Sequence, residues 1–199
     1  MTRQEYIDFI SNVLSPIDKT NRFHKENIRV ACDFVYAEKM AQVLDSAELD
    51  LFTKEYLAQD VTLDASRDLY YMDLPAAIIP IPRISSGIQY INTNQGMALD
   101  FCPTTEREMY YIDGSVTQLV DTTIGYWIQG TKVWFDNSMT PAIATAGVRV
   151  ILIPRFSEFD KDDIVQIPNC TSMQFVQEVI QLIAPSAPVD LKANNAGLT

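Results

Sequence analysis

The chain has 199 residues, a net charge of −11 at neutral pH and an apolar fraction of 47%, a composition typical of a globular protein with a sizeable core. No apolar run approaches the roughly 18 residues of a membrane-spanning helix, and the first residues lack the apolar core of a signal peptide, so we expect no export. The acidic balance argues against a groove that grips nucleic acid by counterion release, but it is compatible with a surface along which DNA passes without binding.

A first helix is predicted to begin after Thr2. Thr2 and Glu5 have the spacing of a capping box, in which the hydroxyl caps the helix and the carboxylate three residues later bonds back to the cap. The helix should end before Pro16, because the residue preceding a proline disfavours helical backbone. Its apolar stripe is Tyr6, Ile7, Ile10, Val13 and Leu14.

The second predicted helix covers residues 26–44 and has neither Pro nor Gly to interrupt it. Thr20 or Asn21 is its expected cap, and its apolar residues recur at three- and four-residue steps, which places them on one face. That face should pack against the first helix in an antiparallel hairpin. It consists of Ile28, Cys32, Val35, Tyr36, Met40, Val43 and Leu44.

Residues 51–154 form the predicted β-rich part. Residues 51–63 favour one strand, with Leu57, Val61 and Leu63 alternating with polar residues, and residues 69–73 favour a second strand that pairs with it as a hairpin.

The later part of this region carries clearer strand signals. Residues 126–128 and 131–135 are rich in aromatic side chains and flank Gln129-Gly130, which predicts another hairpin. A short strand is expected at 87–91, and residues 148–153 give the strongest strand signal in the chain.

A capping box at Thr171 and Gln174 predicts a last helix, with Val176, Val179, Ile180 and Ile183 on its apolar face and Pro185 at its end. Residues 185–199 have too few large apolar side chains to fold alone, so we expect an extended arm. We therefore predict an α+β fold with a single domain at 1–184, containing a helical hairpin (1–46), a mainly antiparallel β-sheet or small barrel (51–154) and a C-terminal helix (171–184).

The sequence contains no recognisable catalytic motif, and we expect no enzyme activity, metal or cofactor. A single histidine, His24, builds no catalytic triad, and we expect it to be solvated or to cap a helix. The three cysteines, Cys32, Cys102 and Cys170, are widely spaced and favour small buried hydrophobes in a reducing compartment over a zinc site. An enzyme with two catalytic carboxylates, such as a glycosidase, is the remaining catalytic alternative.

Three groups of side chains allow both a structural and a functional interpretation. Each of the two acidic groups is expected to form a solvated turn. As alternatives, the first group could bind calcium through its carboxylate oxygens, and the second could form a partner-facing electrostatic patch or bind a metal. The aromatic pairs suit cross-strand packing or, with Trp127 and Trp134, a carbohydrate-binding platform. The acidic groups are Asp60, Asp64, Asp68 and Asp73, and Glu158, Asp160, Asp162 and Asp163; the aromatic pairs include Tyr70 and Tyr71, Tyr110 and Tyr111, Tyr126 and Trp127, and Trp134 and Phe135.

The order of short motifs between residues 52 and 183 resembles virion neck proteins of tailed phages, especially ring or adaptor proteins in the connector of crAss-like phages. The motifs follow two N-terminal helices. They are Leu69-Tyr70-Tyr71-Met72-Asp73-Leu74-Pro75, Ile79-Pro80-Ile81-Pro82, Gly87-Ile88, Tyr126-Trp127-Ile128-Gln129-Gly130, a Val-rich strand, and Asp163-Ile164-Val165-Gln166-Ile167-Pro168.

The resemblance implies a structural virion protein, made in the host cytoplasm, that forms a ring in the head-to-tail connector, with twelve copies expected. Its partners would be other copies, the portal protein and neighbouring tail or ring proteins, with no membrane. DNA would pass through without specific binding, and acidic side chains lining the channel are our hypothesis for that passage.

Two alternatives to the connector ring remain open from the sequence: a tail-tube or tail-completion protein, and a carbohydrate-binding β module. For the ring, the Pro-rich segment and the C-terminal arm are the expected protein interfaces, because a head-to-tail ring needs two different surfaces. The expected interface residues are Pro75, Ile78, Ile79, Pro80, Pro82, Pro185, Pro188, Val189, Leu191 and Leu198.

Overall fold

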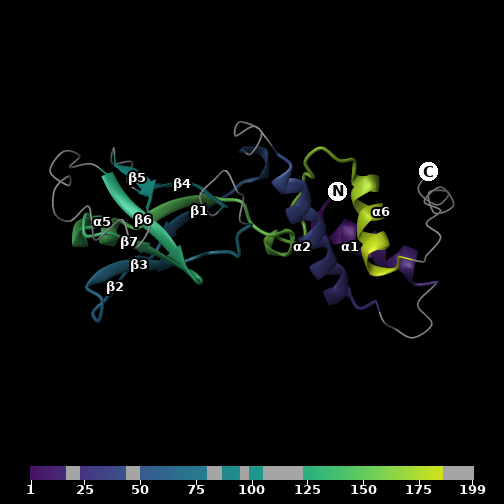
Figure 1. The fold of residues 1–199 in the computed structure, drawn as a ribbon, viewed down its shortest axis with the longest axis horizontal. Helices are drawn as coiled ribbons and strands as arrows, with labels where there is room; N and C mark the ends of the chain where they lie inside the picture. The colour runs from purple at the N-terminus through teal and green to yellow at the C-terminus, as the bar shows by residue number, and fades with distance from the viewer. Residues whose placement is uncertain (17–22, 44–49, 80–86, 95–98, 105–122, 186–199) are drawn as a thin grey trace. The chain divides into compact units, whose positions relative to one another are not determined.

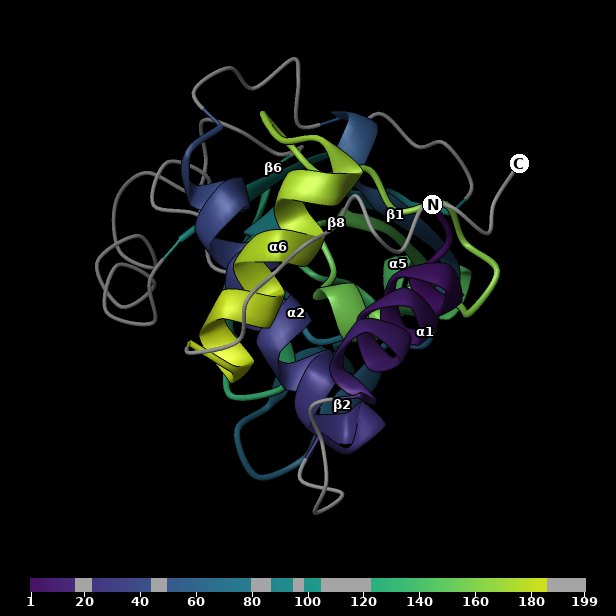
Figure 2. The same ribbon diagram turned by 90° about the vertical axis from the view of Figure 1, so that its right-hand side faces the viewer.

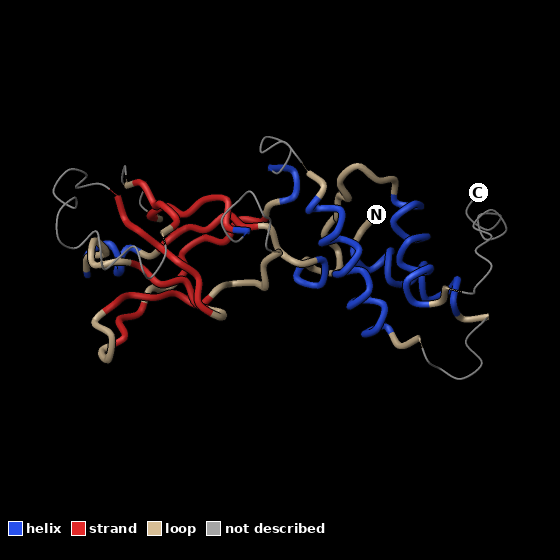
Figure 3. The backbone as a smooth tube through the Cα atoms, in the orientation of Figure 1, coloured by secondary structure: helices blue, strands red, loops and turns tan. Residues whose placement is uncertain are grey.

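The computed structural model describes residues 1–16, 23–43, 50–79, 87–94, 99–104 and 123–185 (Figure 1). The chain divides into two compact units: a helical unit of Met1–Phe52 and Pro154–Thr199, and a β unit of Thr53–Ile153. The long helices belong to the first unit and the strands to the second, as the colours of Figure 3 show. The predicted α+β class is confirmed.

The helical unit is built on three helices, which lie side by side in Figure 2. Helix α6 packs against both α1 and α2, although more than a hundred residues separate it from them in the sequence. The elements of this unit are α1 (Arg3–Leu14), α2 (Lys25–Ala41), the 3₁₀ turns η1 (Asp50–Phe52) and η4 (Phe156–Glu158), and α6 (Ser172–Ile183).

Both predicted capping boxes are present. The Thr2 hydroxyl accepts from the Glu5 amide at 3.2 Å while a Glu5 carboxylate oxygen accepts from the Thr2 amide at 2.8 Å, and Thr171 with Gln174 repeats the arrangement in α6. The predicted cap of α2 was wrong: His24 occupies the cap position and makes no side-chain cap hydrogen bond. Extended backbone at His24 begins that helix, and the His24 carbonyl accepts the amides of Asn27 and Ile28.

Phe156 lies at the centre of the core of the helical unit. Its ring centroid is 5.9 Å from that of Tyr6, 6.2 Å from that of Tyr36 and 5.7 Å from that of Phe175, so the 3₁₀ turn η4 joins all three helices. Its neighbour Ser157 donates its amide to the Asp33 carboxylate at 2.8 Å and accepts the Arg3 guanidinium at 2.6 Å. Aromatic packing and these polar contacts together fix the 156–158 turn against α1 and α2.

The β unit contains two sheets and one short helix, α5 (Pro141–Ala146). The three-stranded sheet has the order β1-β8-β4 and is antiparallel, and the five-stranded sheet has the order β2-β3-β7-β6-β5. The strands are β1 (Lys54–Gln59), β2 (Thr62–Asp64), β3 (Leu69–Asp73), β4 (Ile88–Thr93), β5 (Asp100–Pro103), β6 (Thr123–Gln129), β7 (Lys132–Phe135) and β8 (Val148–Leu152).

One hydrophobic core joins side chains from both sheets of the β unit. Val150 on β8 alternates with half-buried neighbours, so one face of its sheet points inward. Phe135 and Val133 contribute to this core from the five-stranded sheet, and both are fully buried. The core contains Met72, Ala76, Ile88, Ile91, Ile124, Tyr126, Val133, Phe135, Met139, Val148, Val150 and Leu152.

The single strand predicted at 51–63 is wrong. Residues 54–59 form β1, which pairs with β8, whereas Thr62–Asp64 form β2, which pairs with β3 in the other sheet. The register slips between Tyr56 and Gln59, where Ala58 has a positive φ of 51°. A left-handed residue at a bulge redirects the strand. The alternating Leu57 and Leu63 are both exposed, so the alternation did not mark a buried face.

The other strand predictions were mostly correct. The β6–β7 hairpin and β8 lie where the sequence placed them, and β8 is the centre of its sheet. The sheets are antiparallel except for β5, which runs parallel to β6. The small barrel offered as an alternative is not formed: within the described ranges both sheets are open, with β1 and β4, and β2 and β5, as edges.

Gly87 closes the β unit where two segments meet. The Ile153 amide donates to the Gly87 carbonyl at 3.0 Å, and the Ile79 amide donates to the Ile153 carbonyl at 3.1 Å. Gly87 has a φ of 77°, and a Cβ there would overlap the carbonyl oxygen of Ile79. Only glycine combines this backbone conformation with so close an approach.

Candidate interaction groove on the helical unit

Helix α2 carries a second apolar face besides the one that packs into the core. Val30 and Phe34 are one helical turn apart and are 67% and 65% exposed. Ala31 lies between these residues and the buried stripe of α2. Together, Val30 and Phe34 form a small exposed apolar patch on this face of the helix.

The end of helix α6 supplies the opposite wall. Phe175, Val176, Val179 and Ile180 are buried, whereas Leu182, near the end of the helix, is 49% exposed. Leu182 therefore lies outside the buried face of α6 and adds to the exposed apolar surface formed by α2.

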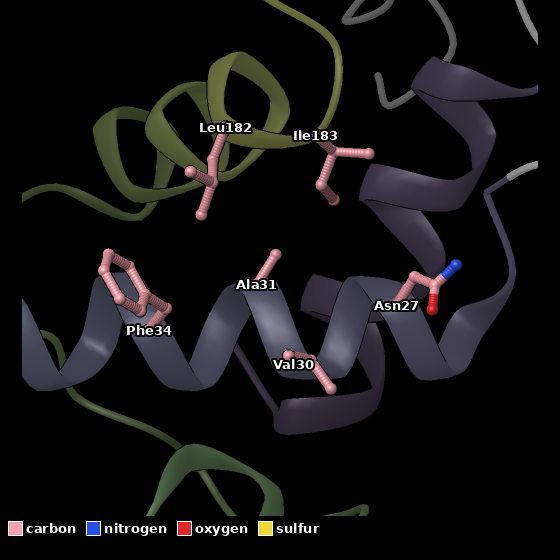
Figure 4. Close-up of a pocket in the computed structure, with 6 residues that line it drawn as sticks. All are labelled: Asn27, Val30, Ala31, Phe34, Leu182 and Ile183. Carbon is pink, nitrogen blue, oxygen red and sulfur yellow. The ribbon is translucent and has the colours of Figure 1, made fainter.

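These side chains enclose an apolar groove between the two helices. Figure 4 shows Leu182 and Ile183 on α6 opposite Phe34 and Ala31 on α2. The groove has a volume of about 420 Å³ and contains no charged side chain in its lining. We call it the α2/α6 groove, and its lining is Asn27, Val30, Ala31, Phe34, Leu182 and Ile183.

An ion pair also joins α2 to α6. The Lys39 ammonium donates to a Glu178 carboxylate oxygen at 2.6 Å, and the Lys39 side chain is 14% exposed. This hydrogen bond to the Glu178 carboxylate raises the pKa of Lys39 above its ordinary value. This contact ties together the two helices that form the walls of the groove.

The aromatic residues of the carbohydrate alternative lie in one row across the five-stranded sheet. Trp127 pairs with Trp134, and Trp134 pairs with Tyr71, through cross-strand register. Trp127 and Trp134 are only 7% and 5% exposed. The Arg67 guanidinium lies 4.5 Å from the Trp134 ring centroid and the Lys132 ammonium lies 3.5 Å from that of Tyr71, so cation–π contacts occupy faces that a sugar would stack on.

The first acidic group lies around the β2–β3 turn. Asp64 accepts hydrogen bonds from the amide and hydroxyl of Ser66, and the hydroxyl bond does most to hold the Asp64 pKa below its ordinary value. In the second group the Asp163 carboxylate accepts the Asp160 amide at 2.8 Å. Among the described residues no group of three or more His, Cys, Asp or Glu side chains is arranged to hold a metal ion.

The cysteines differ in their surroundings. Cys32 is fully buried in α2, and burial raises the pKa of its thiol to about 12, so the thiol is neutral. Cys170 is half-buried and Cys102 is exposed, which departs from the prediction of three buried cysteines. The three are free thiols.

The expected interface residues fall into three groups. Ile79 is 3% exposed, and Ile78 packs against the core of the β unit. Pro75 is half-buried, whereas Pro185 is exposed. The remaining expected residues lie outside the described ranges: Pro80, Pro82, Pro188, Val189, Leu191 and Leu198.

The sequence prediction missed the residues that line the groove most openly: Val30, Phe34 and Leu182. A signal for the first two was present, because they stand four residues apart, away from the core stripe of α2. Leu182 carried no comparable signal, since it follows one helical turn after the buried Val179. The groove exists only because α6 packs beside α2.

The fold and the groove define a two-unit α+β protein with an exposed apolar groove on its helical unit. No protein-family model matches the sequence, and a comparison with curated proteins gives no significant match. No helix within the described ranges has both the length and the apolar character required to span a bilayer.

Proposed function

We propose that this protein is a structural subunit of an oligomeric ring in the head-to-tail connector of a tailed phage. The α2/α6 groove is the observation that carries an assembly role. Phe34 and Val30 are each about two-thirds exposed on a helix whose other face is buried, and covering them with another chain removes apolar surface from water.

The particular assembly rests on the resemblance to phage neck proteins. In such a ring the protein would contact other copies, the portal and the neighbouring tail proteins, and DNA would pass through the centre. A net charge of −11 supports this passage, because a surface of the same sign as the phosphate backbone does not bind it. A tail-tube or tail-completion protein uses the same kind of subunit and is the alternative within this proposal.

Light scattering on the full chain tests the proposal. We would measure mass in solution at several concentrations, alone and with portal proteins of tailed phages, since a portal can template ring closure. A closed oligomer, or a complex with a portal, is the expected result, and negative-stain electron microscopy then separates a ring from a stacked tube. A chain that remains monomeric with every portal would overturn the proposal.

A matched substitution pair links the assembly to the groove. Phe34→Gln exchanges an exposed ring for a polar side chain that helices tolerate, and Ile164→Gln makes a similar change at another exposed position of the helical unit, 72% exposed. We expect Phe34→Gln to weaken the portal complex or the oligomer at least tenfold and Ile164→Gln to leave it near the wild-type value. Thermal unfolding of both variants controls for folding.

A further inference from the structure

We infer that the α2/α6 groove binds the C-terminal segment of a second copy of this chain, through Val189, Leu191 and Leu198. This inference rests on the proposed function, which supplies the oligomer in which two copies meet. It names the two surfaces that a head-to-tail contact requires: a groove on one copy and a segment on the next.

The position of the groove relative to the end of α6 is the first argument. Leu182 and Ile183 line the groove, and α6 ends at Ile183 (Figure 4). The sequence continues for 14 residues beyond the exposed Pro185. Every copy therefore presents the groove next to the point where this segment departs.

Chemical complementarity is the second argument. The groove lining has no charged side chain, and the large apolar residues of the segment are Val189, Leu191 and Leu198. Val189 and Leu191 stand two residues apart, so in an extended chain they project from the same side. A pair of this kind suits a shallow apolar groove between two helices.

Two prolines favour a second copy over the same copy as the source. Pro185 and Pro188 each fix φ and disfavour helical backbone at the preceding residue. An extended proline-rich backbone rises about 3.1 Å per residue, so the stretch from Ala184 to Val189 has a maximum reach of roughly 15 Å. A chain of that reach is long enough to contact the groove of a neighbouring copy, as a head-to-tail assembly requires.

The test uses two full-length variants whose defects are complementary. The groove variant carries Val30→Gln and Phe34→Gln, and the segment variant carries Val189→Gln and Leu191→Gln. Ile164→Gln is the control, and thermal unfolding checks that each variant is folded. Sedimentation velocity measures the oligomeric state of each chain at rising concentration.

We expect the wild type and the control to associate progressively with concentration and each variant alone to remain monomeric. An equal mixture of the two variants should form dimers and nothing larger, because the pair retains one intact groove and one intact segment that can meet. This limit on size is specific to a head-to-tail contact between copies.

The remaining outcomes overturn the inference and bear differently on the proposed function. Variants that associate like the wild type show that copies meet through other surfaces, and the ring proposal then stands without this contact. If the wild type remains monomeric at every concentration, or the mixture gives no dimers, the segment does not bind a second copy. The portal experiment then decides the ring proposal separately.

Discussion

Tyr6 and Tyr36 are both buried in the helical unit, but only one of their hydroxyls has a hydrogen-bond partner. The Tyr6 hydroxyl bonds to the Ser172 hydroxyl at 2.8 Å, whereas the Tyr36 hydroxyl is buried without one. Burial is the main cause that raises the pKa of both phenols. An unpaired buried hydroxyl costs desolvation free energy that no contact returns.

Removing each hydroxyl should therefore have a different effect on stability. We expect Tyr36→Phe to leave the free energy of unfolding unchanged or to raise it by about 1 kcal/mol, because an unsatisfied group is lost. Tyr6→Phe should lower it by about 1 kcal/mol, since Ser172 loses its partner. Urea unfolding of both variants at pH 7 measures the difference, and a larger loss in Tyr36→Phe than in Tyr6→Phe would contradict the assignment.

At the scale of elements, tight connections between strands depend on two glycines with similar backbone and different surroundings. Gly87 has a φ of 77° and Gly130, in the β6–β7 turn, a φ of 66°. A Cβ on Gly130 would meet nothing within 4 Å, whereas a Cβ on Gly87 would overlap the Ile79 carbonyl. Substitutions at the two glycines therefore separate two free-energy penalties: that of a left-handed backbone at Gly130, and that of the same backbone plus a steric clash at Gly87.

Alanine substitutions at these positions should differ accordingly. Gly130→Ala carries only the left-handed penalty and should lower the free energy of unfolding by about 1–2 kcal/mol. Gly87→Ala adds the displacement of backbone and should cost at least about 3 kcal/mol. Chemical denaturation measures the free energy of unfolding of the two variants. Equal decreases would show that the backbone contact between Ile79 and Gly87 can adjust to a Cβ without loss of stability.

The helix starts show which boundaries can be predicted from neighbouring residues in the sequence. The capping boxes at Thr2 and Thr171 fixed two helix starts, because their hydrogen bonds join residues only three apart. The start of α2 departed from the prediction, since His24 supplies extended backbone and no side-chain cap. A boundary without a side-chain signal is set by packing, which local sequence does not encode.

At the scale of the whole molecule, the two units differ in continuity along the chain. The β unit is one continuous segment, Thr53–Ile153, and contains both sheets and every member of its hydrophobic core. The helical unit joins Met1–Phe52 to a second segment that begins at Pro154. Phe156 and Phe175, on which Tyr6 packs, belong to that second segment.

Fragments of the chain should reflect this difference. We expect residues 53–153 alone to fold, with dispersed amide resonances and a cooperative thermal transition, because the fragment retains its complete core. Residues 1–52 alone should remain largely unfolded, since α1 and α2 lose Phe156 and α6. Nuclear magnetic resonance spectra of both fragments test this, and an unfolded 53–153 fragment would show that the β unit needs the helical unit.

The candidate groove shows the limit of the sequence at this scale. Val30 and Phe34 stand four residues apart on a predicted helix, and this spacing marks a second apolar face. Nothing local indicates that Leu182 comes to lie against that face, because contacts over about 150 residues are not encoded in any short pattern. The aromatic residues were visible in the sequence, but only the structure shows that Trp127 and Trp134 are buried. It also shows that cations cover the rings of Trp134 and Tyr71.

The sequence by itself determined the α+β class, the three long helices, the β6–β7 hairpin and the strand β8, because apolar periodicity and capping act between near neighbours. Only the tertiary structure decided that residues 51–63 divide between two sheets, that β5 runs parallel to β6, and that α6 packs beside α2 to open the groove. Those features depend on which distant apolar surfaces bury one another, and burial is a property of the whole fold.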